Sequence, residues 1–194
     1  MTSSAKPGPR ERLLLTAQEL TYAQGVGVGV DALLKGAGVA RRSLYEHFGG
    51  KDGLIAEVLR RSTAEDVERY RATMDAAGAD PRARLLAVVD RLGRIAAGPD
   101  FHGCRYLAAD LALTDPDHPG HEVTRAYRRT LHGLFEDEFA ALGHVRPGSA
   151  ADQLLLLVDG LLAAGATRPG SDPAAAAREL AGHLIDACPA GAPG

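Results

Sequence analysis

The segment 30–49 constrains the fold most, because it joins two short amphipathic stretches through a single glycine. Leu33 gives the first stretch an apolar face, and Leu44 and Phe48 give one to the second at the i, i+4 spacing of a helix. Gly38 lies between the stretches and, having no Cβ, can take the positive φ that ends a helix. This pattern predicts two short helices and a tight turn, which is the layout of a helix-turn-helix.

The polar residues of the second stretch are donors and amphipathic side chains of the kind that contact DNA. Two adjacent arginines begin the expected helix, where acids are preferred, so we interpret them as contacts to phosphate or guanine and not as a solvated helix start. A lysine opens the next helix, where it can pair with a phosphate. The predicted DNA contacts are Arg41, Arg42, Ser43, Tyr45, His47 and Lys51. The alternatives are packing for His47 and plain exposure for Lys51.

The charge of the chain is unevenly distributed, and this bears on nucleic-acid binding. The 194 residues carry a net charge of −3, but residues 1–53 are net +2 and residues 54–194 are net −5. Only the part that contacts DNA needs a positive field, so the asymmetry has the sign expected of a DNA-binding protein.

The composition is that of a globular chain, with 45% apolar and 24% charged residues. There is no run of 18 or more apolar residues and no apolar segment at the amino terminus. We therefore expect neither a membrane span nor a secretory signal, and a cytoplasmic location. Cys104 and Cys188 lie far apart, which fits reduced structural thiols, with a redox pair as the alternative.

Helical periodicity recurs along the chain and alternating patterns are nearly absent, which predicts an all-α fold. Asp172 and Pro173 are an N-cap residue followed by proline at the first helical position. Outside the helix-turn-helix, helices are expected over about 10–24, 51–77, 80–97, 103–113, 121–142, 149–166 and 173–187.

Several residues of the first four expected helices carry a family resemblance. They are Ala17, Tyr22, Gly25, Ala37-Gly38-Val39, Ser43-Leu44-Tyr45, His47-Phe48, Lys51 and Leu54. With these residues the amino-terminal third of the chain, about 10–60, resembles the TetR/AcrR (tetracycline-repressor) family of bacterial transcriptional regulators. Two features depart from the family pattern. Val28 and Gly29 stand where a Thr or Ser commonly caps the second helix, and Gly49-Gly50 stands where a polar pair is usual.

The resemblance implies a homodimeric, all-α repressor with about nine helices in each subunit. A three-helix DNA-binding domain would occupy residues 1–53, and a helical bundle for effector binding and dimerisation would occupy residues 54–194. The expected partners are a palindromic double-stranded DNA operator, a second copy of the chain and a small-molecule effector. The helix from Lys51 would transmit the effector's action. No cofactor, metal or catalytic residue is implied, and we do not expect an enzyme.

The last two expected helices carry more apolar surface than they can hide against one neighbour, which predicts a four-helix dimer interface. Its expected residues are Leu154, Leu155, Val158, Leu161, Leu162, Leu180 and Leu184. Apolar side chains with a few polar ones in the middle of the chain fit an effector pocket, with ordinary core positions as the alternative. These are Met74, Phe101, His102, Cys104, Tyr106, Asp110 and Tyr127.

Other kinds of site also have to be weighed. The glycines of segment 25–29 suggest a nucleotide-binding loop, but a helix and not a strand precedes them. A cluster of oxygen and imidazole groups at Asp115, Asp117, His118 and His121 suggests a metal site. We favour a turn that ends in a helix cap, with Pro119 in the first turn of the helix.

Two other functions would use the same residues differently. A small all-α enzyme would rely on His102 with Cys104, or on the 115–121 cluster, although no nucleophile, base and orienting acid are ordered in the sequence. A helical partner protein without DNA binding would fit the weak cap at Val28 and Gly29.

Overall fold

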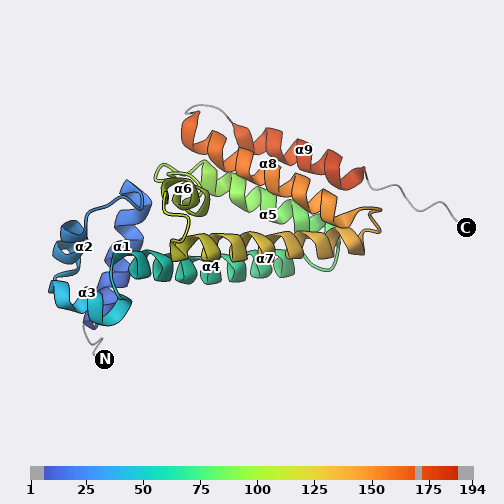
Figure 1. Cartoon of the computed structure of the whole chain (residues 1–194). Helices are drawn as coiled ribbons and strands as arrows, with labels where there is room; N and C mark the ends of the chain where they lie inside the picture. Colours follow the sequence, from blue (N-terminus) through green and yellow to red (C-terminus); the bar gives the residue numbers. More distant parts are fainter. Residues whose placement is uncertain (1–6, 169–171, 188–194) are drawn as a thin grey trace, which may run out of the picture. The chain divides into compact units, whose positions relative to one another are not determined.

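The structure, a computed structural model, describes residues 7–168 and 172–187 (Figure 1). Within those ranges it contains nine α-helices and no strand, which confirms the expected all-α fold. The helices are α1 (Pro9–Gln24), α2 (Val30–Ala37), α3 (Arg41–Phe48), α4 (Lys51–Ala76), α5 (Pro81–Ala96), α6 (Arg105–Ala112), α7 (Pro119–Ala141), α8 (Pro147–Thr167) and α9 (Pro173–Asp186).

The described chain forms two compact units, and each is discontinuous in sequence. The first unit holds the described residues up to Ala64 together with Arg105–Arg125, and the second holds Glu65–Cys104 with the described residues from Ala126 onward. Helices α6 and the start of α7 thus belong with the helix-turn-helix. The domain boundary predicted between residues 53 and 54 falls inside α4 and stays a prediction.

The first unit is built around an apolar core shared by α1, α2, α3 and the start of α4. Its buried members are Leu13, Leu14, Ala17, Val28, Leu33, Leu34, Ala37, Leu44, Leu54 and Val58. Gly38 has φ 61° and ψ 45° and donates its N–H to the last carbonyls of α2, so it ends that helix as predicted. Val39 and Phe48 pack against the same core while partly exposed.

The second unit contains a three-helix layer of α5, α8 and α9, which pack on one another. Small residues allow the close approach, because a Cβ on Gly93 would come within 2.7 Å of Ala174 Cβ, and one on Gly165 within 2.7 Å of Ala96 Cβ. Asp172 caps α9 by accepting from the N–H groups of Ala174 and Ala175, with Pro173 at the first helical position.

This packing changes the role of four leucine and valine positions expected at the dimer interface. Leu154, Val158, Leu161 and Leu162 have exposed fractions of 0–7% within the single chain. They are buried within the single chain, on a helix that packs on α5 and α9, so they leave little surface for a second copy to cover. Leu155 and Leu184 are partly exposed, and Leu180 is 57% exposed. Leu156, which was not predicted, is 71% exposed.

Helix α8 is also long and apolar enough to cross a membrane by length and composition, with a mean hydropathy of 1.3. Its burial pattern is that of an amphipathic helix in a bundle, since its buried side chains pack on neighbouring helices. Asp159 on α8 also makes an ion pair with Arg128 at 2.9 Å. We therefore interpret α8 as a core helix.

Candidate DNA-binding site

Helix α3 has one buried residue, two partly buried residues and five exposed ones. Leu44 is 1% exposed and anchors the helix on the first unit's core. The side chains of Arg41 and Arg42 are 56% and 86% exposed, and Tyr45 is 56% exposed. His47 is exposed as well, whereas Ser43 is partly buried. The helix therefore offers two guanidinium groups, a phenol and an imidazole on its free surface, as DNA contact requires.

Both arginines are held by carboxylates, a feature that the sequence pattern did not predict. Arg41 donates to Asp31 of α2 at 2.6 Å, and Arg42 donates to Glu46 one turn further along α3 at 2.5 Å. Ion pairs this exposed contribute about 0–1 kcal/mol each. A DNA phosphate can therefore replace either carboxylate at small cost.

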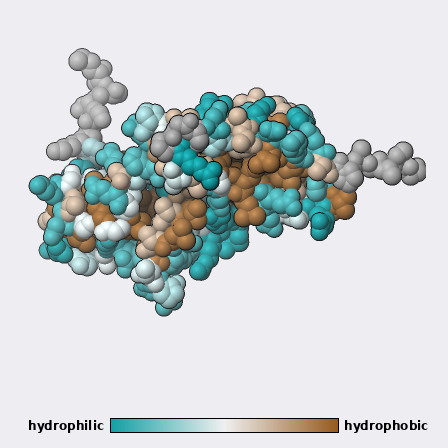
Figure 2. All heavy atoms as spheres, turned by 90° about the horizontal axis from the view of Figure 1, so that it is seen from above, coloured by the Kyte–Doolittle hydropathy of each residue, from teal (hydrophilic) through white to brown (hydrophobic). Residues whose placement is uncertain are grey.

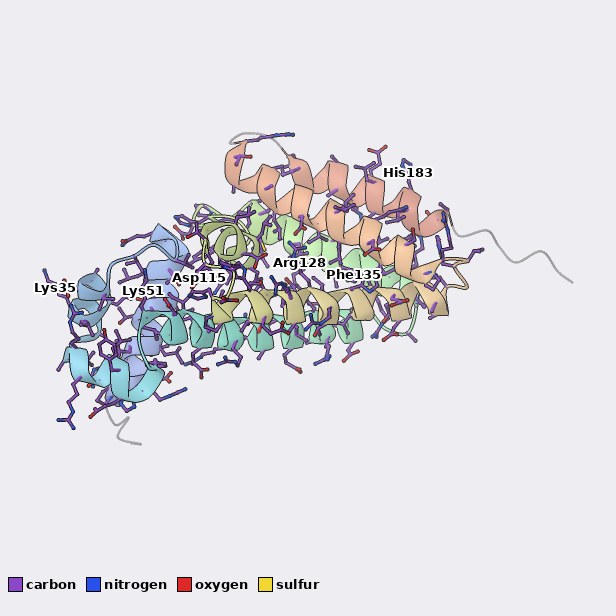
Figure 3. All side chains as sticks on the ribbon, in the orientation of Figure 1. Lys35, Lys51, Asp115, Arg128, Phe135 and His183 are labelled. Atoms are coloured by element: carbon purple, nitrogen blue, oxygen red, sulfur yellow. The ribbon has the colours of Figure 1, made fainter. Side chains whose placement is uncertain are left out.

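Two glycines, Gly49 and Gly50, separate the end of α3 from Lys51 at the start of α4. Gly49 ends α3 with φ 71°, and α4 begins at Lys51, whose side chain is partly exposed (Figure 3). Gly53 lies so close to the end of α3 that a Cβ on it would stand 1.9 Å from the carbonyl oxygen of Phe48. The approach of α4 to α3 thus depends on Gly53, which was not singled out in the sequence.

Arg12 fixes the turn of the helix-turn-helix from α1. Its guanidinium donates to the carbonyl oxygens of Ala37 at 3.0 Å and Gly38 at 3.3 Å. These two carbonyls lie at the end of α2, where helical partners run out. Arg12, counted only as positive charge in the sequence, is a structural residue of the turn.

The start of α2 agrees with the departure noted in the sequence. Gly29 is the N-cap and makes no side-chain hydrogen bond, and Val28 is 6% exposed within the core of the first unit. Val28, at a position that could carry a capping hydroxyl, packs in the core instead. Any phosphate contact at the start of α2 must therefore come from backbone N–H groups.

Residues 13–58, which span α1 to the start of α4, match the sequence model of the bacterial regulatory proteins of the tetR family. The HTH-type transcriptional regulator BetI of Stenotrophomonas maltophilia is 31% identical over 191 residues, covering 93% of each chain. The chain belongs to the TetR family. It is a DNA-binding transcriptional regulator, as the resemblance implied, and its relatives are named as regulators and not as enzymes.

Two further proteins support the TetR assignment. The crystal structure of a TetR-type transcriptional regulator from Streptomyces avermitilis superposes with a TM-score of 0.85 and 37% identity, covering 94% of this chain and 98% of that one. The HTH-type transcriptional repressor KstR2 of Rhodococcus jostii is 35% identical over 88 residues, covering 45% of this chain and 43% of its own. The likeness to the Streptomyces protein thus extends through the whole helical body.

The 115–121 cluster of this TetR-family chain forms the predicted turn and cap. Asp115 accepts the N–H of Asp117 at 3.0 Å, and the ring Nδ1 of His118 accepts the N–H of Gly120 at 2.9 Å at the start of α7. His118 is 7% exposed, and its Nε2 lies 3.5 Å from Asp52 Oδ1 in the first turn of α4. Among the described residues no group of three or more His, Cys, Asp or Glu is placed to bind a metal ion.

Asp110 joins α6 to the start of α7 within the same unit. It accepts hydrogen bonds from His121 Nδ1 and Thr124 Oγ1, each at 2.7 Å. Burial alone would raise the pKa of Asp110, but these hydrogen bonds and the nearby positive charges of His121 and Arg125 lower it below its ordinary value. Asp110 was predicted as an effector contact; in the structure it also positions α7.

We expect the Asp110 carboxylate to stabilise the fold above about pH 4 and to lose this effect as the pH falls further. A carboxyl group whose pKa is lower in the folded state stabilises it above the unfolded pKa, and the contribution disappears as the pH drops through the folded value. Denaturant unfolding of wild type and Asp110→Asn at pH 7 and pH 3 measures this. The stability difference should shrink at pH 3, whereas Asp137→Asn, at an exposed position on α7, should show no such trend. A pH-independent difference would contradict the assignment.

The residues predicted for the effector pocket fall in both units. Met74, Phe101, His102, Cys104 and Tyr127 belong to the second unit, and Tyr106 and Asp110 belong to the first. Met74 and Tyr127 are buried, whereas His102 is exposed and its Nδ1 lies 2.7 Å from the carbonyl of Asp100. Cys104 is partly exposed and forms no disulfide with a described residue, and Cys188 lies outside the described residues.

Tyr70 and Tyr127 form a buried polar pair in the second unit, of which only Tyr127 was predicted as a pocket residue. The hydroxyl of Tyr127 donates to that of Tyr70 at 3.2 Å, and burial raises the pKa of Tyr70 to about 12. Tyr70 is 7% exposed and Met74, one turn further along α4, is 1% exposed. Tyr70 could have been found in the sequence, because it shares the apolar stripe of α4 with Met74. The pair places two hydroxyl groups in the interior of the second unit, one turn from Met74.

Proposed function

We propose that this TetR-family regulator is a ligand-responsive repressor that binds a palindromic operator as a homodimer in the cytoplasm. Arg41, Arg42, Ser43, Tyr45, His47 and Lys51 are the proposed DNA contacts. The observation that carries the proposal is the exposure of both arginines on a helix whose single fully buried residue is Leu44. Repression, the finer part of the proposal, is supported by the name of the relative KstR2.

A homodimer is supported by the apolar face of α8 and α9. Leu156 and Leu180 are 71% and 57% exposed, and Leu155 and Leu184 are partly exposed beside them in sequence. Figure 2 looks down on these two helices and shows hydrophobic atoms gathered over them. Large exposed apolar side chains on two adjacent helices fit a two-fold, self-complementary interface of four helices. We therefore revise the proposed interface to the exposed leucines, with Leu156 added.

An effector site is proposed in the helical body, near the Tyr70–Tyr127 pair and Met74. Buried hydroxyl groups beside apolar side chains are the usual composition of a small-molecule site. Within the first unit, Arg105 at the start of α6 contacts α1 and α4, because it lies 4.7 Å over the ring of Tyr22 and donates to Ser62 Oγ at 3.2 Å. A shift of α6 would thus reach α1 and α4. Coupling between two binding sites typically changes the affinity for the second ligand, here DNA, roughly 5- to 150-fold.

Selection of bound DNA from a random pool tests the proposed function. A homodimer with one recognition helix in each subunit should enrich a two-fold symmetric site whose half-sites lie about 34–36 Å apart. Failure to enrich any sequence would favour a helical partner protein without DNA binding. An asymmetric site would contradict the dimer but not the contact residues.

We expect Asp31→Asn to tighten operator binding roughly two- to five-fold. The change removes the carboxylate that competes with phosphate for Arg41 and also removes a negative charge close to DNA; an exposed pair is worth about 0–1 kcal/mol. Fluorescence anisotropy with the selected site at constant salt measures the effect. Glu19→Gln is the matched control, since it removes the same charge from an exposed position on α1. Equal gains in both variants would argue against a specific competition at Arg41.

A further inference from the structure

A hollow of about 500 Å³ lies between α4 and α5 of the second unit, and none of its lining residues is assigned to DNA or effector contact. One face of each helix lines it, at the i, i+3 and i+4 spacing that brings side chains to the same side. Its lining residues are Arg69, Ala72, Thr73, Ala76, Ala77, Ala87, Asp90, Arg91 and Arg94. The walls are thus alanine methyl groups, and the charged groups are three arginines and one aspartate.

Two of the three arginines have no carboxylate to pair with. Arg69 is held by Asp66 at 2.7 Å and Glu65 at 3.3 Å, and Asp90 is held by Arg178 of α9. Within the described part of the chain, Arg91 and Arg94 make neither a hydrogen bond nor an ion pair. The hollow therefore presents two uncompensated positive charges, three residues apart on one helix.

Arg91 is the more informative of the two, because its Nε is buried and unsatisfied. It is the single buried side-chain nitrogen or oxygen without a hydrogen-bond partner among the residues that the structure describes. Leaving such a donor unpaired costs about 1–3 kcal/mol, and more when the group is charged. The terminal nitrogens of the same guanidinium are not among the buried atoms, so a ligand in the hollow can accept hydrogen bonds from them. Because the charge of Arg91 has no partner within the described part of the chain, an oxyanion is favoured over a neutral molecule.

A second hollow in the same unit lacks this feature. It has a volume of about 670 Å³ and lies between α7 and α8. Its Arg128, labelled in Figure 3, is paired with Asp159 at 2.9 Å, and its His132 lies 3.3 Å from Asp152. The charges there are matched by the protein itself, in contrast to Arg91 and Arg94 of the hollow between α4 and α5.

We propose that this hollow binds a small organic anion, gripped at a carboxylate or phosphate group by Arg91 and Arg94. The planar guanidinium group presents paired N–H donors that match both kinds of oxyanion. The methyl groups of Ala72, Ala76 and Ala87 would contact the apolar part of the ligand. Because no proposed DNA-binding residue takes part, anion binding can be tested independently of operator binding.

Isothermal titration calorimetry of the full chain with phenyl phosphate, benzoate, inorganic phosphate and benzamide tests the proposal. Phenyl phosphate and benzoate separate the two oxyanions, inorganic phosphate lacks the apolar part, and benzamide lacks the charge. We expect at least one aromatic anion to bind more tightly than inorganic phosphate, and benzamide to bind at least roughly ten-fold more weakly than that anion. Equal affinity for benzamide and the two aromatic anions, or no binding of either anion, would overturn the proposal.

Two charge-neutralising variants locate the site. Arg91→Gln and Arg94→Gln should each weaken anion binding roughly ten- to hundred-fold, and Arg71→Gln, at an exposed position of α4 outside the hollow, should leave it unchanged. Arg94 is exposed, so its variant keeps the test valid if Arg91→Gln folds poorly. In ¹H–¹⁵N spectra of wild type, the Arg91 Nε signal should shift on addition of the anion. Unchanged affinity in both variants, or an Arg91 signal that does not move at saturation, would refute the assignment.

Discussion

The Arg41→Ala, Arg42→Ala double variant is expected to bind the selected operator at least about 100-fold more weakly than wild type. Both guanidinium groups are exposed on α3, and a dimer would lose four of them at once. An arginine that reads guanine contributes roughly 1–3 kcal/mol of discrimination, and one that binds phosphate contributes through counterion release. Neither side chain packs in the core, so the free energy of unfolding should change by less than about 0.5 kcal/mol.

Anisotropy titrations at several salt concentrations measure this loss and separate its causes. The slope of log K against log[salt] should fall by about 0.9 for each phosphate contact removed, whereas loss of a guanine contact reduces sequence preference. The matched control is Arg71→Ala with Arg146→Ala, which removes two exposed arginines outside the first unit. If the Arg41, Arg42 variant bound the operator as tightly as wild type, the proposed contact surface would be wrong. An equal loss of operator affinity in the control variant would mean that the effect comes from net charge and not from contacts of Arg41 and Arg42.

The recognition helix could be predicted from the sequence because its determinants are local. Leu44 and Phe48 recur at helical spacing, and Gly38 supplies the one backbone conformation that the turn needs. The partner of Arg41 could not be predicted, since Asp31 lies ten residues away and faces Arg41 only after α2 and α3 have packed. The same holds for Arg12, whose bonds to the turn span 25 and 26 residues. The pair of Arg42 with Glu46 is local, at the i, i+4 spacing of one helix.

The leucines of α8 show a different limit of sequence patterns. Periodicity indicates that Leu154, Val158 and Leu161 are buried, but it does not tell whether their own subunit or a second copy buries them. The structure buries them within their own subunit, on a helix that packs on α5 and α9. Close contacts at Gly93 and Gly165 make that burial possible, and a contact between distant glycines and alanines leaves no trace in helical periodicity.

The division of the chain into two units was likewise hidden in the sequence. Helix α6 follows α5 by eight residues, yet it belongs with α1–α4 of the first unit. Arg105 and His118 make the relevant contacts, to Tyr22 and Ser62 and to Asp52. Each is a long-range pairing of single side chains, so local propensity carries no information about it. The residues predicted for one effector pocket are divided between the two units for the same reason.

Gly53→Ala is expected to destabilise the first unit by about 3 kcal/mol or more and to abolish operator binding with it. A Cβ at residue 53 would lie 1.9 Å from the carbonyl oxygen and 3.1 Å from the carbonyl carbon of Phe48. Both atoms are backbone, so no side-chain rotation relieves the overlap. The end of α3 or the start of α4 must move, and Leu44 and Leu54 tie both helices to the same core.

Thermal unfolding by circular dichroism and anisotropy with the selected operator measure the two effects together. Gly27→Ala is the matched control, because a Cβ there meets no atom within 4 Å and the residue is exposed. If Gly53→Ala matched the control in both stability and affinity, α4 would not need its close approach to α3. If stability fell and affinity stayed, the α3–α4 junction would be structural alone. We expect both to fall, because the register of Lys51 relative to Arg41 and Arg42 depends on the backbone that the new methyl group displaces.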